Sequence, residues 1–550
     1  MDIKEDFHKR LVSSLEALRT DRLPWWQVWR EIAMYYIPKR YIWLASKTER
    51  KDYVGKNGNI LDGSGTKAGR ILAAGMMNGV TSPSRPWFKL RIPGMDDDAE
   101  LEVRMWLDEV ERRMLQVMAE SNFYNALALL YIDLVFFGTG AMLIYEDYVS
   151  VIRCYNNALG EYYLGQDDRL MVNRFAREFS LKVGQLVSKF GKENCSQTVQ
   201  NLYDRGQHLE DIEICHMIEP NVGPYYPTPK TFEFRETYWE RGAQQGKVLY
   251  CGGYHEIPGL FPRWEITAND AYGTSPGMDA LGDVIQLQHE TKRKGQSLDY
   301  MVRPPMVLDI QLQHRPTALL PGGQTFVSGV NSAGAKPAYE VRPPIAELSA
   351  DIRDVQTRIR EIFHNDLFQM ISQLETVRTA TEIDARREEK LVQLGPVLER
   401  FENEALDPAI KRIYSIMVRK NLLPEPPPAL ENVQLEVQYV SILASAQSAV
   451  GVIPTERFLQ LVGSLAAVYE DAPLIPNVEE LLRDYARDIG VKAKGLNSRD
   501  QVAQTKQARD QEKQMAQAAA VAPPAADAAK LLSETDVGGG ANALQQMMGG

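Results

Sequence analysis

Cysteine and long uninterrupted hydrophobic stretches are scarce in this sequence. Its 550 residues include four cysteines, which are far apart and form no C-x-x-C pair: Cys154, Cys195, Cys215 and Cys251. We therefore expect free thiols in a reducing compartment and no disulfide framework. The N-terminal stretch MDIKEDFHKR is charged throughout and is not expected to act as a signal peptide.

The most hydrophobic stretch, LALLYIDLVFFGTGAMLIY at 127–145, is too interrupted to predict a membrane span. Asp133 lies inside it, and Gly138, Thr139 and Gly140 break it. The pattern favours a buried helix that ends at the glycines, followed by a strand, AMLIYED. We expect no membrane partner.

The sequence also lacks an excess of positive charge. With 62 basic and 73 acidic side chains, its formal net charge is −11. Tight binding to nucleic acid depends on basic residues that replace counterions, so this composition argues against a protein that grips DNA. It does not argue against a protein that lets DNA slide past. Hydrophobic residues make up 44% and charged residues 25%, which predicts a mostly globular chain of about two to four domains.

No motif for catalysis, metal binding or cofactor binding is visible. LDGSGTKAGR at 61–70 resembles a nucleotide-binding loop, but Lys67 does not stand in the Gly-Lys-Ser/Thr run that such a loop needs. We predict instead the entrance of a helix rich in small residues. Cys251 and His255 form a close Cys/His pair, which is too few ligands for zinc. The sequence therefore predicts no enzyme, no cofactor and no metal site.

The order of local patterns predicts an α+β protein that is predominantly helical. Residues 1–135 have helical spacing of hydrophobic residues, whereas 140–270 contain short segments typical of strands, such as FEFRETYWE. A helix is predicted after Ser275, which suits the N-cap position, with Pro276 as its first residue. A stretch rich in proline and glycine follows at 303–344.

The clearest helical pattern is a heptad of hydrophobic residues spaced alternately by three and four. Its members are Ile345, Leu348, Ile352, Val355, Ile359 and Ile362. Two interpretations fit this pattern equally well: an amphipathic helix packed on its own domain, and a helix packed beside neighbours in an assembly.

A second long helix is predicted after a capping box formed by Thr379 and Glu382. Gly395 and Pro396 should kink this helix, because proline removes a backbone hydrogen bond and clashes with the preceding turn. From about residue 500 the sequence is low in complexity, which predicts a flexible and partly helical tail.

Four blocks of sequence, in order over most of residues 20–450, resemble the head-to-tail connecting (portal) proteins of short-tailed bacteriophages. The first is WWQVWREIAMYYIPKR with LDGSGTKAGRILAAGMMNGVTSPSRPWFKL, and the second is FFGTGAMLIYED. The third is YGTSPGMDALGDVIQLQHETKRKGQSLDYMVRPPMVL. The fourth is RTATEIDARREEKLVQLGPVLERFENEALDPAIKRIYSIMVRKNLLPEPPPAL, which continues into VQYVSILASAQ. The last part of the chain contributes little to the resemblance.

The resemblance implies a ring of identical subunits, usually twelve, at one capsid vertex. Double-stranded DNA would enter and leave through its channel without sequence-specific contacts. The implied partners are a terminase motor, tail adaptor proteins, and capsid and scaffolding proteins. The implied location is the virion, with assembly in the host cytoplasm. An alternative function is a tail adaptor or internal virion protein without a DNA channel. A packaging ATPase would need a Walker A loop and acidic metal ligands, and neither is visible.

The wing, stem, clip and crown of the family map onto the chain by shape. The implied segments are the wing at 1–274, stem helices at 275–302 and 345–366, the clip at 303–344, the tunnel loop at 367–379, the kinked helix returning to the wing at 380–440, the helical crown at 441–499 and the tail at 500–550.

Polar residues of the first stem helix and of the tunnel loop are the implied candidates for the DNA channel. They are Lys292, Arg293, Lys294, Gln369, Ser372, Gln373, Thr376 and Arg378. The basic members also fit two other interpretations, which stay open here: solvated surface charge and pairing between subunits. The heptad residues are implied to pack within the stem or between subunits.

Overall fold

The structure of the protein is a computed structural model that describes residues 3–45, 60–92, 101–223, 228–242, 248–302, 306–308, 335–337, 344–368, 394–428, 436–440 and 499–534, with Val462, Ser464, Asn477 and Leu481. The chain divides into two compact units. The first contains Met1–Leu90, Asp108–Glu425 and Val437–Gly451, and the second contains Arg91–Leu107, Pro426–Glu436 and Val452–Gly550.

Helices dominate the first part of the chain, as the hydrophobic spacing predicts. They are α1 (Ile3–Arg22), α2 (Trp26–Tyr35), α3 (Tyr41–Leu44), α5 (Ser64–Val80), α6 (Leu101–Glu120) and α7 (Phe123–Phe137), with 3₁₀ turns η1 (Leu23–Trp25) and η2 (Pro38–Arg40). α2 ends shortly before Pro38, because proline cannot donate the next helical hydrogen bond.

The hydrophobic stretch at 127–145 forms a buried helix and then a strand, which confirms the sequence prediction. α7 ends at Gly138, whose φ of 73° suits glycine. Asp133 inside α7 is buried and lies 2.8 Å from the Arg40 guanidinium. Burial raises the pKa of Asp133 to about 6, and the charge of Arg40 opposes this rise. Among the described residues, no helix is both long and apolar enough to span a membrane.

Two antiparallel sheets follow α7. The smaller has the strand order β3-β2-β9, and the larger has the order β4-β5-β6-β7-β8. Their bounds are β2 (Met142–Asp147), β3 (Val151–Asn156), β4 (Tyr162–Gln166), β5 (Val172–Lys182), β6 (Asp211–Pro220), β7 (Phe234–Glu240), β8 (Tyr250–Tyr254) and β9 (Gly259–Leu260). The helices α8 (Val183–Phe190) and α9 (Gln197–Asp204) connect β5 to β6.

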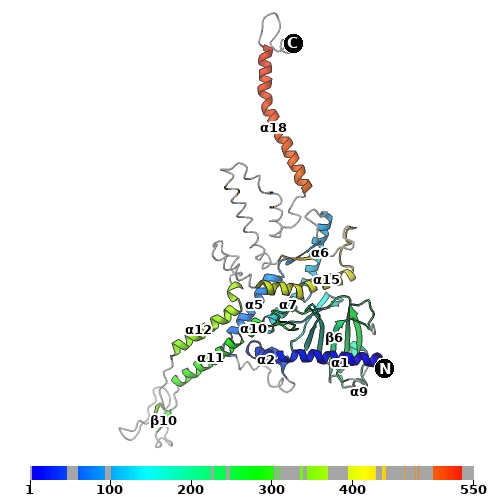
Figure 1. The fold of residues 1–550 in the computed structure, drawn as a ribbon, viewed down its shortest axis with the longest axis vertical. Helices are drawn as coiled ribbons and strands as arrows, with labels where there is room; N and C mark the ends of the chain where they lie inside the picture. Colours follow the sequence, from blue (N-terminus) through cyan, green and yellow to red (C-terminus); the bar gives the residue numbers. More distant parts are fainter. Residues whose placement is uncertain are drawn as a thin grey trace. The chain divides into compact units, whose positions relative to one another are not determined.

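The larger sheet is covered on both faces. α1 runs along it (Figure 1), and Leu11 and Leu15 of α1 belong to a core cluster with Met217. Residues of α8 and α9 form a second cluster with Ile214. Ile214 and Met217 lie on the same strand and serve opposite faces, because side chains alternate along a strand. All four cysteines are free, as predicted, and Cys215 packs in the cluster with α1.

Small residues let α5 approach its neighbours closely, as the sequence predicts. A Cβ atom on Gly65 would lie 2.8 Å from the Val284 side chain, which is closer than real contacts allow. A Cβ atom on Gly69 would overlap the ring of Phe136 on α7. These two glycines are four residues apart and lie on the same face of α5. The stretch that resembled a nucleotide loop is therefore the start of a tightly packed helix.

The chain returns to the sheets through a helical segment that starts at Leu394. Residues 394–401 are α-helical, η4 (Glu402–Leu406) is a π-helix, and α15 (Asp407–Arg419) completes the segment. Residues 369–393 lie outside the described part of the chain. The predicted capping box at Thr379 and Glu382 therefore cannot be compared, and the kink at Gly395 and Pro396 stays a prediction.

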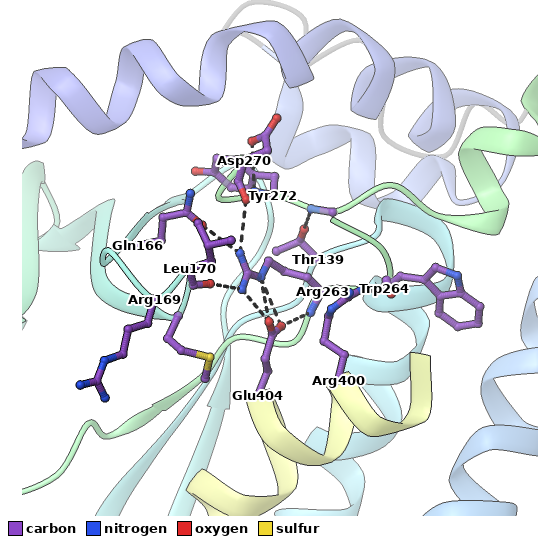
Figure 2. Close-up of polar contacts among 12 residues, drawn as sticks. Thr139, Gln166, Arg169, Leu170, Arg263, Trp264, Asp270, Tyr272, Arg400 and Glu404 are labelled. Carbon is purple, nitrogen blue, oxygen red and sulfur yellow. Dashed lines mark hydrogen bonds and ion pairs between the residues drawn. The ribbon is translucent and has the colours of Figure 1, made fainter. Parts of the chain in front are cut away.

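A buried ion pair joins this return helix to the strand region (Figure 2). Nη2 of Arg263 lies 2.6 Å from Oε1 of Glu404, and the backbone amide of Arg263 donates to Oε2 at 2.9 Å. The guanidinium also donates to the carbonyls of Leu170 and Asp270 and to the Gln166 side chain. Both partners of the ion pair are almost fully buried. The π-helix contains Glu404, so this irregular turn supplies the carboxylate.

Two further elements lie near the end of the described chain. β12 (Glu436–Tyr439) pairs with β1 (Phe88–Arg91). α18 (Arg499–Glu534) is a single helix in the segment for which the sequence predicted a flexible, partly helical tail. Alanine, glutamine, lysine and arginine, which favour helices, are frequent in its first half.

Replacing Glu404 should test how much the buried ion pair contributes. Glu404→Gln leaves the Arg263 charge buried without a counter-ion and should lower the free energy of unfolding by about 3–5 kcal/mol. Urea unfolding followed by tryptophan fluorescence measures this change. Glu399→Gln, an exposed position in the same helical segment, should change stability by less than about 0.5 kcal/mol. Equal unfolding midpoints for the two variants would show that the pair contributes little.

Candidate functional site

Two long antiparallel helices project from the core and form the most distinctive feature of the first unit. α10 (Pro276–Asp279) starts at Ser275, whose hydroxyl accepts from the Met278 amide at 3.1 Å, as the predicted N-cap requires. α11 (Leu281–Val302) follows, and α12 (Ile345–Ile362) runs back beside it (Figure 1). At the far end, β10 (Met306–Leu308) pairs with β11 (Ala335–Pro337) in antiparallel fashion.

A polar contact at the base fixes the helix pair to the start of α5. The buried side chain of Gln288 on α11 accepts from the amides of Leu61 and Asp62 at 2.7 and 2.9 Å. The same side chain donates to the Asp62 carbonyl at 2.9 Å. On α12, Gln356 donates to the Asp62 carboxylate at 2.8 Å. Asp62 also accepts from the Ser64 amide, so one aspartate joins α5, α11 and α12.

The heptad residues divide into a buried and a half-buried group. Ile352, Val355 and Ile359 are buried, with exposed fractions of 7%, 0% and 0%. The half-buried members are Ile345, Leu348 and Ile362. α12 packs against α11 and α5 of its own chain, so the buried part of the seam is filled within one protomer.

The far half of the helix pair has little core of its own. No residue of α11 beyond Gln288 is buried, although several are apolar. The exposed apolar side chains at this end are Leu298, Tyr300, Met301 and Val302. Apolar side chains that cluster on an exposed surface are typical of a surface that other protein covers.

The predicted DNA-channel residues fall into two groups: those that the structure describes and those that lie outside its described part. Lys292 and Arg293 are exposed on α11, and Lys294 is half-buried there. None of these three has an ion-pair partner among the described residues. The others, Gln369, Ser372, Gln373, Thr376 and Arg378, lie outside the described part of the chain.

The residues directly after α12, up to Phe368, are packed against other helices of the core. α12 ends at Ile362, and His364 then adopts a positive φ of 49°. Phe363 packs against the rings of Tyr36 and Phe136. Phe368 packs against Gly75 of α5, where a Cβ atom would overlap its ring. α12 thus ends at a turn at 363–364, and residues 365–368 are helical again. The assignment of 345–366 to a stem helix stays a prediction.

The described residues contain no group of three or more His, Cys, Asp and Glu that could hold a metal ion. The Cys251 sulfur lies 3.2 Å from the Thr228 hydroxyl, and His255 packs on Phe232. Lys67 is exposed on α5, and its amide donates to the Gly63 carbonyl as part of the first helical turn. These contacts are those of packing and helix initiation.

One buried and one partly buried polar pair have no signal in the sequence. In the larger sheet, Nε2 of His216 lies 2.9 Å from Glu236, and burial lowers the pKa of His216 to about 4. At the base of the helix pair, Gln288 and Asp62 are far apart in the sequence. Such residues resemble solvated surface positions until the fold brings them together, so local pattern could not have found them.

Comparisons with known proteins give a consistent result. The family model described as "Bacteriophage head to tail connecting protein" matches residues 8–496. A "Probable portal protein" of Bordetella phage BPP-1 is 39% identical over 534 residues, which cover 96% of each chain. A "Portal protein" of Salmonella phage epsilon15 is 38% identical over 532 residues, which cover 96% of this chain and 95% of the relative.

Placing a charge in the seam of the helix pair should disrupt it. Ile359→Asp buries an unpaired carboxylate between α12 and its neighbours and should lower the free energy of unfolding by several kcal/mol. Urea unfolding and the yield of assembled particles in size-exclusion chromatography measure the effect. Thr357→Asp, an exposed position on the same helix, should leave both nearly unchanged. Parent-like stability and yield for Ile359→Asp would contradict the role of this seam.

Proposed function

The chain belongs to the family of bacteriophage head-to-tail connecting proteins, and we propose on this basis that it is a phage portal protein. Relatives named as portal proteins match at 38–39% identity over 96% of the chain, and this observation supports the proposal most strongly. The protein would form a ring at one vertex of the capsid. DNA would be packaged and ejected through this ring, which would bind the terminase motor first and the tail afterwards.

The helix pair supplies the element that such a ring needs. α11 and α12 would form the stem, with the segment at 303–344 as the clip and residues 1–274 as the wing. An interface between different faces of identical subunits closes into a ring when the rotation between subunits permits. The exposed apolar end of α11 is a surface that neighbouring subunits would cover.

The charge of the protein suits a conduit. Its formal net charge is −11, so DNA would pass an overall acidic protein and would not be held by many basic contacts. The polar tunnel loop, including Gln369, Ser372 and Gln373, would border the DNA. Its start would be fixed by Phe368, which is buried against α5. The work of packaging would come from the motor, and the ring itself would have no catalytic role.

The virion is the proposed location, with assembly in the host cytoplasm. Capsid and scaffolding proteins would meet the ring at the vertex, and tail adaptor proteins would bind after packaging. The residues from 441 to 499 would form the crown.

Purified protein should form rings with a central hole and should not hydrolyse ATP. Negative-stain images and light scattering measure the assembly, and phosphate release measures hydrolysis. Compact particles without a hole would favour the alternative of a tail adaptor or internal virion protein. ATP turnover that persists after repurification and disappears in Lys67→Ala would contradict the non-enzymatic role.

Shortening the tunnel loop should impair DNA handling without preventing assembly. Deletion of residues 370–377 leaves Phe368 and the packed core intact, so ring yield should stay at the parent level. Packaged DNA per particle should fall, because the polar segment proposed to border the DNA is lost. Rings with a normal DNA content would contradict the proposed position of this loop.

A further inference from the structure

One long side of the helix pair is acidic. Glu347, Asp351 and Asp354 of α12 are exposed and are spaced by four and three residues, so they lie along one side of the helix. We call these three residues the acidic flank. Arg358 lies on the same side and donates to Asp283 of α11 at 3.1 Å. This side of α12 therefore borders the side of α11 that contains Asp283.

Basic side chains predominate on the opposite side of the pair, although Asp299 of α11 lies further out on this side and the half-buried Lys294 lies on the acidic side. Arg353 of α12 lies about 100–160° around the helix axis from each residue of the acidic flank. Lys292 of α11 is nine residues beyond Asp283 and lies about half a turn around the axis from it. Both side chains are exposed. We call Lys292 and Arg353 the basic flank.

The five side chains of the two flanks lack partners among the residues that the structure describes. In the described part of the chain, none of them forms an ion pair or a side-chain hydrogen bond. The two flanks lie on opposite sides of the helix pair, so they cannot pair with each other within one copy. Opposite charges are thus displayed on opposite sides of the same element.

The two flanks also lie at the same level along the helices. Counted outward from the contact between Asp283 and Arg358, Asp354 is four residues away, Arg353 five and Asp351 seven. On the same count, Lys292 is nine residues away along α11, between the levels of Asp351 and Glu347. Because α11 and α12 are antiparallel and rise by about 1.5 Å per residue, equal counts mean equal heights.

Rotation about a ring axis leaves the height of each residue along that axis unchanged. For helix pairs that stand side by side along the axis, Lys292 of one copy would meet Glu347 and Asp351 of the next. Arg353 would meet Asp351 and Asp354 of that same neighbour. The contact joins two different faces, which is the kind of interface that closes into a ring.

We propose that the acidic flank of each copy binds the basic flank of the neighbouring copy. The inference rests on the ring proposed above and names residues that join its subunits. Exposed ion pairs are individually weak, so these contacts set the direction and register of neighbouring helix pairs more than the total affinity. Lys292 then serves subunit pairing, whereas Arg293, on the side of α11 that faces away from α12, stays a candidate for the DNA channel.

Charge reversal of either flank tests the proposal. Asp351→Lys with Asp354→Lys gives copies with two basic flanks, and Lys292→Glu with Arg353→Glu gives copies with two acidic flanks. Each double variant alone should lose the ring species in light scattering and negative-stain images, at a salt concentration at which the parent forms rings. An equimolar mixture should recover rings, because acidic flanks then meet basic flanks again.

A matched control separates the flanks from general effects of charge. Arg169→Glu with Lys411→Glu makes the same change in net charge as Lys292→Glu with Arg353→Glu, at exposed positions elsewhere, and should keep the parent ring yield. Thermal unfolding of each variant alone should match the parent, since all the substituted side chains are exposed.

Several outcomes would overturn the pairing of the flanks. They are rings at the parent yield from either flank variant alone, a mixture of normally folded variants that forms no rings, and normal rings of the Lys292→Glu and Arg353→Glu variant that package less DNA. The last outcome would put the basic flank in the channel. A parent protein that forms no ring at any salt concentration would contradict the proposed function itself.

Discussion

The buried ion pair between Arg263 and Glu404 joins two points of the chain that are 141 residues apart. The helix pair α11 and α12 lies between these two residues in the sequence. The chain thus leaves the core after Arg263 to form the helix pair and returns before Glu404, and the ion pair joins the two ends of this excursion. Asp62 and Gln288 add a second, partly buried contact at the base of the pair. Buried contacts of this kind are costly to break, because each leaves a charge or an amide without a partner. These contacts thus hold the helix pair firmly at its base.

This arrangement fits the function proposed for the family member described here. A subunit of a DNA conduit needs a base that does not deform and an outer surface that identical neighbours can cover. The base is supplied by side chains from α5, α11 and α12 that meet at Asp62. The outer half has exposed apolar and charged side chains and almost no core. The proposed function requires no catalytic group in either region, because the motor that drives DNA would be a separate protein.

Local signals in the sequence predicted much of the fold. The glycine at the end of α7, the cap at Ser275 and the heptad of α12 each act within a few residues, so the sequence alone is enough to read them. The partners of Arg263 and Asp62 were not predictable, because they are distant in the sequence and resemble ordinary surface residues. The family was recognisable from four blocks together, whereas the channel residues stay a prediction, because most of them lie outside the described part of the chain. The low complexity of the last segment predicted some helix but not its bounds, because such a composition carries no capping signal or hydrophobic period.

The close packing of α5 has a consequence for symmetry. Gly65 and Gly69 determine how closely α5 approaches α11 and α7. The Asp62 contact connects the start of α5 to the base of the helix pair, so the position of α5 also affects the position of that base. A methyl group added at Gly69 would shift α5 and so tilt the pair by a small angle. In a closed ring the same angle is repeated at every interface, and the rotations must still sum to a full circle. If the protein forms the proposed ring, such a small local change is therefore expected to alter the number of copies in it.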